Sequence, residues 1–264
     1  MVVCRPPTVA RWIAPGWSPD WDGPEGDEFA GATGAAGTAE RRYVRAGVVA
    51  AIALPVIVSL DTITRRDGYD GSIHWISLLS HGHRGWIERL VLLSTGVLIL
   101  LGGVGLGHQR GWPPRSLRWT ARSAITLGSG IVLAAVFRID VVPSYPVGSR
   151  HVPVSPAGVV HAVAGSLIVG ALVAATVSGS GLLAGTDRRG VWRAWSLACA
   201  TFVLVPMAVC TVKAAGAGGN WEVARAGTCQ RVALFAGLGW LATAGGVVLR
   251  RNRPVVPLET ARTD

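Results

Sequence analysis

Charged residues are scarce in this sequence, and lysine is almost absent. Only 15% of the 264 residues are charged, whereas an ordinary soluble domain has roughly 25%. Lys213 is the single lysine; the other basic residues are arginines, which lie between long apolar runs and form no single patch. Although the formal net charge is +10, this distribution argues against nucleic-acid binding and favours a membrane protein.

Motifs that would indicate an enzyme or a metal site are also missing. The chain contains no CxxC, no HExxH zinc motif and no GxSxG nucleophile elbow. Its four cysteines are Cys4, Cys199, Cys210 and Cys229, and the last two fall near the same predicted membrane face on adjacent helices. The sequence leaves open both a Cys210–Cys229 disulfide and buried free thiols.

The sequence has long apolar runs in place of these motifs. Each of six runs is close to the ~20 residues that a helix needs to cross the hydrocarbon core, and the alternation expected of barrel strands is absent. We therefore predict an all-α fold with a six-helix transmembrane domain at 41–251. A disordered tail without a signal peptide is expected at 1–40, and a short tail at 252–264. The predicted spans are 43–60, 86–107, 120–137, 157–179, 191–212 and 227–249.

The arginines predict how the spans are oriented. They cluster before the first span, between the second and third, between the fourth and fifth, and after the sixth. If the spans alternate, all four clusters share one side, and the positive-inside rule makes that side cytoplasmic. Both termini are then cytoplasmic, and the connections at about 61–85, 138–156 and 213–226 face outward.

Polar residues gather at the predicted outer ends of the spans. Ionisable residues within spans are costly and usually face a partner or a wet cavity. We therefore expect Glu88 and Arg89, together with His161 and Arg231, to point into the bundle at its outer mouth. A guanidinium matches phosphate through two hydrogen bonds. The candidate ligand-binding residues are Arg138, Asp140, His161, Gln230 and Arg231.

Several interpretations of these residues stay open. They can bind a lipid or envelope-component head group, or serve only as structural hydrogen-bonding partners. As an alternative, His161 and Asp140, with His81 and His83, would hold a zinc ion in a membrane-embedded lipid amide or ester hydrolase. Ser77 with His161 and Asp140 would be the serine variant of that hydrolase. A small-molecule transporter is the third interpretation, but the chain shows neither a clear internal repeat nor charges in the middle of a span.

Three stretches of the sequence carry short motifs in a fixed order. The first has an Ile-Ser turn followed by a Gly-Trp helix start, the second has Phe-x-x-Asp and then Gly-x-x-His, and the third has Gly-x-x-Gln-Arg. The residues of these motifs are Ser77, Trp86, Phe137, Asp140, Gly158, His161, Gly227, Gln230 and Arg231. Together they resemble the bacterial multi-pass membrane family catalogued as "domain of unknown function 998". The resemblance covers about residues 43–251 and implies a six-helix bundle with a polar outer mouth, but no established activity.

The leading prediction is a non-catalytic protein of a bacterial plasma membrane. Its outer pocket is expected to bind a lipid or envelope-component head group, so its partners are membrane lipids and not nucleic acid. No cofactor is expected outside the zinc alternative, and the sequence identifies no protein partner.

Overall fold

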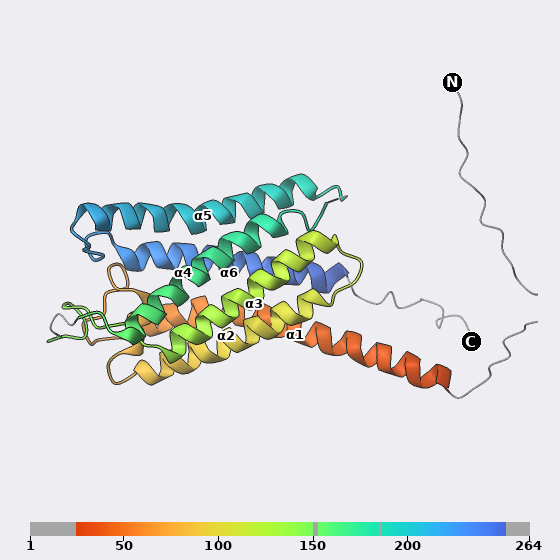
Figure 1. Cartoon of the computed structure of the whole chain (residues 1–264), viewed down its shortest axis with the longest axis horizontal. Coiled ribbons are helices and arrows are strands. Elements are labelled where there is room, and N and C mark those ends of the chain that lie inside the picture. The colour runs from red at the N-terminus through yellow and green to blue at the C-terminus, as the bar shows by residue number, and fades with distance from the viewer. Residues whose placement is uncertain (1–24, 150–152, 185, 252–264) are drawn as a thin grey trace, which may run out of the picture. The chain divides into compact units, whose positions relative to one another are not determined.

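The computed structural model describes residues 25–149, 153–184 and 186–251, which form helices and connecting loops without a β-strand (Figure 1). The all-α prediction is therefore confirmed for this part of the chain. The elements are α1 (Glu25–Thr64), the short 3-10 helix η1 (Ile76–Ser80), α2 (Gly85–Gly107), α3 (Pro114–Val136), α4 (Pro156–Gly179), α5 (Arg189–Gly216) and α6 (Ala226–Arg251).

Each of the six α-helices contains a stretch long and apolar enough to cross a membrane. The predicted six-span, multi-pass membrane protein is thus confirmed, and in α1 the candidate span is Gly37–Thr64. Helix α1 begins at Glu25, inside the stretch predicted as a tail. Residues 1–24 and 252–264 lie outside the described residues, so the disordered tails stay a prediction.

Two helix starts are set by proline. Helices α3 and α4 begin at Pro114 and Pro156, where the missing N–H costs nothing because the first turn has no carbonyl to receive it. Ser155 caps α4, since its side chain accepts a hydrogen bond from the Gly158 N–H. The start of α3 lies earlier than the predicted 120, because the helix continues through a polar first turn that the apolar run does not include.

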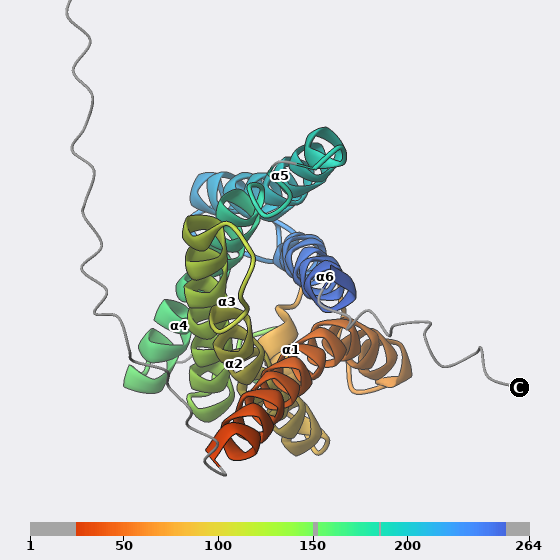
Figure 2. The same cartoon turned by 90° about the vertical axis from the view of Figure 1, so that its right-hand side faces the viewer.

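The helices pack in a bundle with α3 between α2 and α4, and with α5 against α6 (Figure 2). Glycines allow the closest approaches between neighbouring helices. A Cβ on Gly47 of α1 would lie 3.0 Å from the Cα of Gly102 of α2, and a Cβ on Gly96 would lie 2.9 Å from the Gly128 carbonyl of α3. Such small residues let helix backbones come together where lipid provides no hydrophobic driving force.

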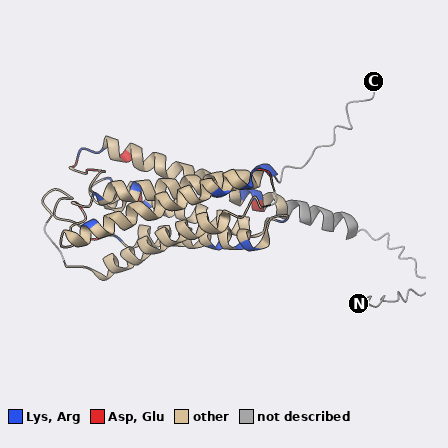
Figure 3. Ribbon diagram, turned by 90° about the horizontal axis from the view of Figure 1, so that it is seen from above, with Lys and Arg blue, Asp and Glu red and all other residues tan. Residues whose placement is uncertain are grey.

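The connections divide between the two ends of the bundle. At one end, Arg251 lies over the ring of Trp112, and a Cβ on Gly181 would touch Ser116. This arginine-rich end (residues 40–45, 107–122, 180–184, 186–193 and 248–251) holds many of the basic residues in Figure 3. The opposite end, here named the loop end, contains residues 62–86, 137–149, 153–161 and 213–231. Which end faces the cytoplasm stays a prediction.

Candidate functional site

Asp140 holds Ser155, the residue that caps the start of α4. Its Oδ2 accepts a hydrogen bond from the Ser155 N–H at 3.0 Å, and its Oδ1 accepts one from the Ser155 hydroxyl at 2.6 Å. The Ser155 hydroxyl oxygen in turn accepts the Gly158 N–H at 3.0 Å. Both carboxylate oxygens of Asp140 are therefore used to fix the turn that leads into α4, which satisfies N–H groups that a helix start leaves free.

His161 joins the same turn to the end of α3. Its Nδ1 lies 2.7 Å from the carbonyl oxygen of Phe137, the residue that follows α3. A carbonyl can only accept, so Nδ1 carries the hydrogen and the ring is fixed in that tautomer. Phe137, Asp140, Gly158 and His161 thus form one connection, here named the α3–α4 clamp.

Gly158→Ala is expected to break the α3–α4 clamp. A Cβ at this position would overlap the Asp140 carboxylate, so the cap and the helix start could not coexist. Loss of a cap costs about 1 kcal/mol and overpacking roughly 1–3 kcal/mol, so we expect a lower apparent Tm in detergent. Gly165→Ala is the matched control on the same helix, because nothing lies within 4 Å of its added Cβ. Equal Tm values for the two variants would contradict the clamp.

Arg231 fastens the start of α6 to the first loop. Its Nη1 donates to the Gly71 carbonyl at 2.5 Å and to the His74 carbonyl at 3.3 Å. Its Nη2 donates to the Thr62 hydroxyl at 3.0 Å and to the Tyr69 hydroxyl at 2.9 Å. The terminal amino groups that would contact a phosphate are therefore engaged by the protein itself.

Gln230 and Gly227 complete this attachment. Gln230 Oε1 accepts the Ile76 N–H at 2.6 Å, at the start of η1. A Cβ on Gly227 would collide with the carbonyls of His74 and Gly71, so only glycine allows the loop to approach α6 this closely. The Gly-x-x-Gln-Arg stretch thus holds the first loop to the last helix, and we name it the α6 clamp.

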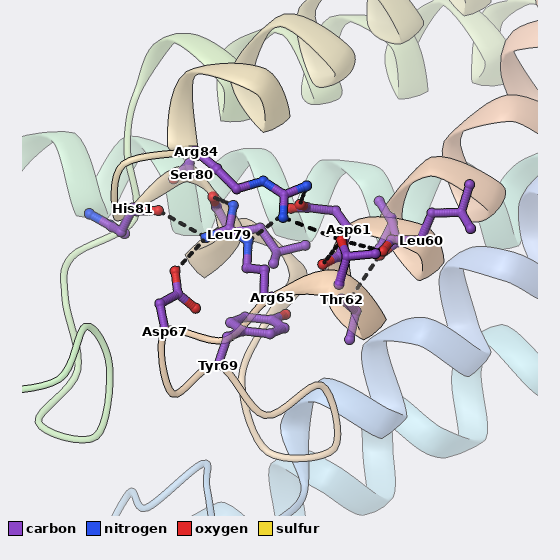
Figure 4. A network of polar contacts seen from close by, with 12 residues as sticks. Leu60, Asp61, Thr62, Arg65, Asp67, Tyr69, Leu79, Ser80, His81 and Arg84 are labelled. Atoms are coloured by element: carbon purple, nitrogen blue, oxygen red, sulfur yellow. Dashed lines mark hydrogen bonds and ion pairs between the residues drawn. The ribbon is translucent and has the colours of Figure 1, made fainter.

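Arg65 is the centre of a buried polar network at the loop end (Figure 4). Its side chain is 0% exposed, and its Nε donates to Asp61 Oδ2 at 2.9 Å. Nη2 donates to the Leu79 carbonyl at 2.6 Å, while Nη1 donates to the His81 carbonyl at 3.1 Å and to the Tyr145 hydroxyl at 2.8 Å. Arg65 therefore links α1, the η1 segment and the α3–α4 connection. The sequence did not single it out.

Two further charges close the network. Arg84 pairs with Asp61 at 2.9 Å, and Tyr145 donates to Asp67 Oδ2 at 2.9 Å while accepting from Arg65. Burial, with the hydrogen bond to Asp67, raises the pKa of Tyr145 to about 12, and burial raises that of Tyr69 to about 12. Both phenols stay protonated at neutral pH and act as donors, so the network is a structural brace.

The zinc interpretation requires ligands that the structure does not assemble. Among the described residues, no group of three or more His, Cys, Asp and Glu side chains could hold a metal ion. His81 Nε2 lies 2.8 Å from the Ile139 carbonyl, and burial lowers the pKa of this ring. His83 is exposed in the turn that precedes α2, whereas Asp140 and His161 belong to the α3–α4 clamp.

Ser77 lies in η1 and is buried. Its carbonyl accepts the Ser80 hydroxyl at 2.6 Å. In the described part of the chain, no hydrogen bond joins Ser77 to His161 or His161 to Asp140. The nucleophile–base and base–orienter contacts that a serine hydrolase requires are therefore not formed in this structure.

A groove of about 350 Å³ opens between α2 and α3 near the loop end. One arginine, Arg89, lies among apolar walls, and its Nε donates to the Ala135 carbonyl at 3.2 Å. Within the described residues, its guanidinium makes no other hydrogen bond or ion pair. The groove is lined by Trp86, Arg89, Leu90, Leu93, Ala135 and Val136.

Of the two neighbouring residues Glu88 and Arg89, both expected to point into the bundle, only Glu88 does so. Glu88 does point into the bundle, where it is 1% exposed and its Oε1 has no hydrogen-bond partner among the described residues. Arg89, expected to do the same, instead lines the lateral groove. Arg138 is exposed just beyond the end of α3, where its guanidinium makes no hydrogen bond or ion pair with any described residue.

One family model matches most of the chain. A family model described as "Protein of unknown function (DUF998)" matches residues 48–247, a stretch that contains the clamps, the Arg65 network and the groove. No curated protein and no solved structure matches the chain.

Proposed function

Since the chain belongs to the DUF998 family, whose description names no activity, we propose a function from the geometry of the groove. This multi-pass protein, in a bacterial plasma membrane, binds an anionic lipid from the outer leaflet between α2 and α3. The observation that carries the proposal is Arg89, a cation with unengaged terminal amino groups in an otherwise apolar groove.

Charge complementarity favours a phosphate as the polar group. Arg89 follows the start of α2 at Gly85 by about 6 Å of helix rise, so it lies near the predicted membrane surface. Its Nε is fixed on the Ala135 carbonyl, which orients the planar guanidinium and leaves both Nη groups for the oxygens of one phosphate. Arg138, at the end of α3, supplies a second unengaged guanidinium at the same end of the bundle.

The apolar walls suit the remainder of a lipid. Leu90 and Leu93 continue along α2 below Arg89, and Val136 lies on α3. Trp86, which is 62% exposed, stands at the groove mouth, where indole rings favour the membrane interface. A volume of about 350 Å³ falls within the usual range of ligand sites, ~300–1,000 Å³, and accommodates a head group with the first part of an acyl chain.

Four of the other candidate ligand residues already bond to the protein itself, which leaves Arg89 and Arg138 as the guanidiniums available to a phosphate. Arg231, Gln230, Asp140 and His161 bond to backbone atoms or to Ser155, Thr62 and Tyr69. These contacts would have to break before a phosphate could replace them. The hydrolase and transporter interpretations gain no comparable observation, so the lipid-binding function is the one put forward.

Arg89→Ala is expected to weaken binding of an anionic phospholipid by about 10- to 100-fold, because a hydrogen bond to a charged group contributes roughly 1.5–3 kcal/mol. The measurement is native mass spectrometry of protein in neutral detergent, titrated separately with phosphatidylglycerol and with phosphatidylcholine. Wild type should retain phosphatidylglycerol in preference to phosphatidylcholine.

The matched control is Arg66→Ala, which removes an exposed arginine at the loop end outside the groove. It should leave the lipid preference unchanged. Leu93→Trp, which fills the groove and keeps all charges, should reduce binding of both lipids. If Arg89→Ala and Arg66→Ala bind phosphatidylglycerol equally well, Arg89 only extends towards the bulk head groups and the proposed function fails.

A further inference from the structure

A pair of cysteine side chains lies between α5 and α6 at the loop end. Cys210 of α5 is 0% exposed, and Cys229 of α6 packs on the same small cluster. The Cys229 thiol donates to the carbonyl of Ala224, which belongs to the same cluster as Cys210, and both cysteines are free thiols. The clamps, the Arg65 network and the lipid groove make no use of this pair.

We propose that Cys210 and Cys229 are a redox pair that closes to a disulfide between α5 and α6. The surroundings allow the two sulfur atoms to meet, because the cluster around them consists of the small residues Ala214, Ala224 and Ala226, with Trp75 packed against it. The helices that carry the cysteines pack against each other along the bundle, so closing the bond requires only local adjustment.

The position of the pair fits oxidation. The loop end is the predicted outer side, and disulfides persist on the outer face of bacterial membranes, whereas cytoplasmic thiols are kept reduced. Cys199, also on α5 and buried, packs in the large core cluster and not in the small cluster that contains Cys210 and Cys229. The structure therefore distinguishes one pairing among the described cysteines.

The reaction is thiol–disulfide exchange with a disulfide oxidant. Cys229, the more exposed of the two, attacks one sulfur of the oxidant as a thiolate, forming a mixed disulfide and releasing one thiol. The Cys210 thiolate then attacks the Cys229 sulfur and releases the second thiol. Two electrons pass from the cysteine pair to the oxidant disulfide, and the two protons lost by the pair appear on the two released thiols.

Closing this bond would fix the connection between α5 and α6. That connection carries Glu222, whose carboxylate accepts the Ser144 hydroxyl, and Trp221, whose ring lies 5.4 Å from that of Trp75. The disulfide would thus restrain contacts between the α5–α6 connection and the other loops. Reduction would release that restraint while leaving the Arg65 network intact.

The test is a peptide map of purified full-length protein in a Cys4→Ser background, incubated with oxidised glutathione or with dithiothreitol. Remaining thiols are alkylated before digestion with trypsin. Cleavage after Arg193, Lys213, Arg225 and Arg231 separates residues 194–213 from residues 226–231, so a disulfide appears as a linked peptide pair. The main measurement leaves Cys210 and Cys229 unsubstituted, so it stays valid even where a variant of the pair does not fold.

The linked pair is expected after oxidised glutathione, and it should disappear after dithiothreitol. Cys199→Ser is the matched control and should retain the link, which shows that Cys210 and not Cys199 is the partner within residues 194–213. Oxidised protein should also melt several degrees above reduced protein, and Cys229→Ser should lose that difference. Complete alkylation of both cysteines after oxidation, or loss of the link in Cys199→Ser, would overturn the proposal.

Discussion

Arg65→Ala is expected to destabilise the bundle more than any other single change considered. The substitution leaves the partly exposed Arg84 as the remaining ion-pair partner of buried Asp61, and it deprives the Leu79 and His81 carbonyls of their donor. Removing one member of a buried ion pair costs about 3–5 kcal/mol, so the apparent Tm in detergent should fall on the order of 10 °C. The measurement is thermal unfolding followed by size-exclusion chromatography or tryptophan fluorescence.

The adjacent residue provides the control. Arg66 is exposed, and no described residue forms a hydrogen bond or ion pair with it, so Arg66→Ala should unfold within about 2 °C of wild type because exposed charges contribute little. Arg65→Lys keeps the charge but cannot reach Asp61 and both carbonyls at once, so its Tm should lie between the two. If Arg65→Ala unfolds at the same temperature as Arg66→Ala, the Arg65 network does not stabilise the loop end.

Arg231→Ala is expected to have the second largest effect. It removes the donors that hold the Gly71 carbonyl, the Thr62 hydroxyl and the Tyr69 hydroxyl. Unsatisfied groups cost about 1–3 kcal/mol each when buried; since this site is half-buried, we expect a total near 2–4 kcal/mol. The first loop should loosen, and deuterium uptake at the amides of residues 71–78 should rise.

Arg225→Ala tests whether the effect is specific to the α6 clamp. Arg225 is exposed just before the start of α6, and its side chain donates a hydrogen bond to the Ser72 hydroxyl at 3.1 Å. Its substitution should change deuterium uptake at residues 71–78 only slightly. Uptake that rises equally in both variants, or in neither, would show that Arg231 is not what holds the loop.

The apolar runs predicted the spans well because hydrophobic length is what the bilayer requires. Four of the six observed helices (α2, α4, α5 and α6) extend only a few residues beyond the predicted spans, whereas α1 and α3 begin well before their predicted starts. At α3 the helix starts at Pro114, where proline geometry, and not hydropathy, sets the start. The polar first turn of that helix is invisible to a search for apolar residues.

The candidate site was less predictable because its residues bond mainly to backbone atoms. Asp140, His161, Gln230 and Arg231 were singled out as polar residues at the loop end, and they do lie there. Their partners include the Ser155 N–H and the carbonyls of Phe137 and Gly71, which every residue type carries alike. Arg65 and Arg66 show the same limit, since two identical neighbours have opposite environments that only the fold distinguishes.

The α6 clamp has a consequence for the order of biosynthesis. Arg231 and Gln230 bond to residues 160 and 154 positions earlier in the chain, at Gly71 and Ile76. The loop between α1 and α2 therefore emerges from the ribosome long before the residues that hold it in place. A nascent chain with five inserted spans still has unpaired loop carbonyls, and insertion of the last span completes both the bundle and the loop. Truncation before α6 should thus yield a chain that the membrane's proteases recognise as unfinished.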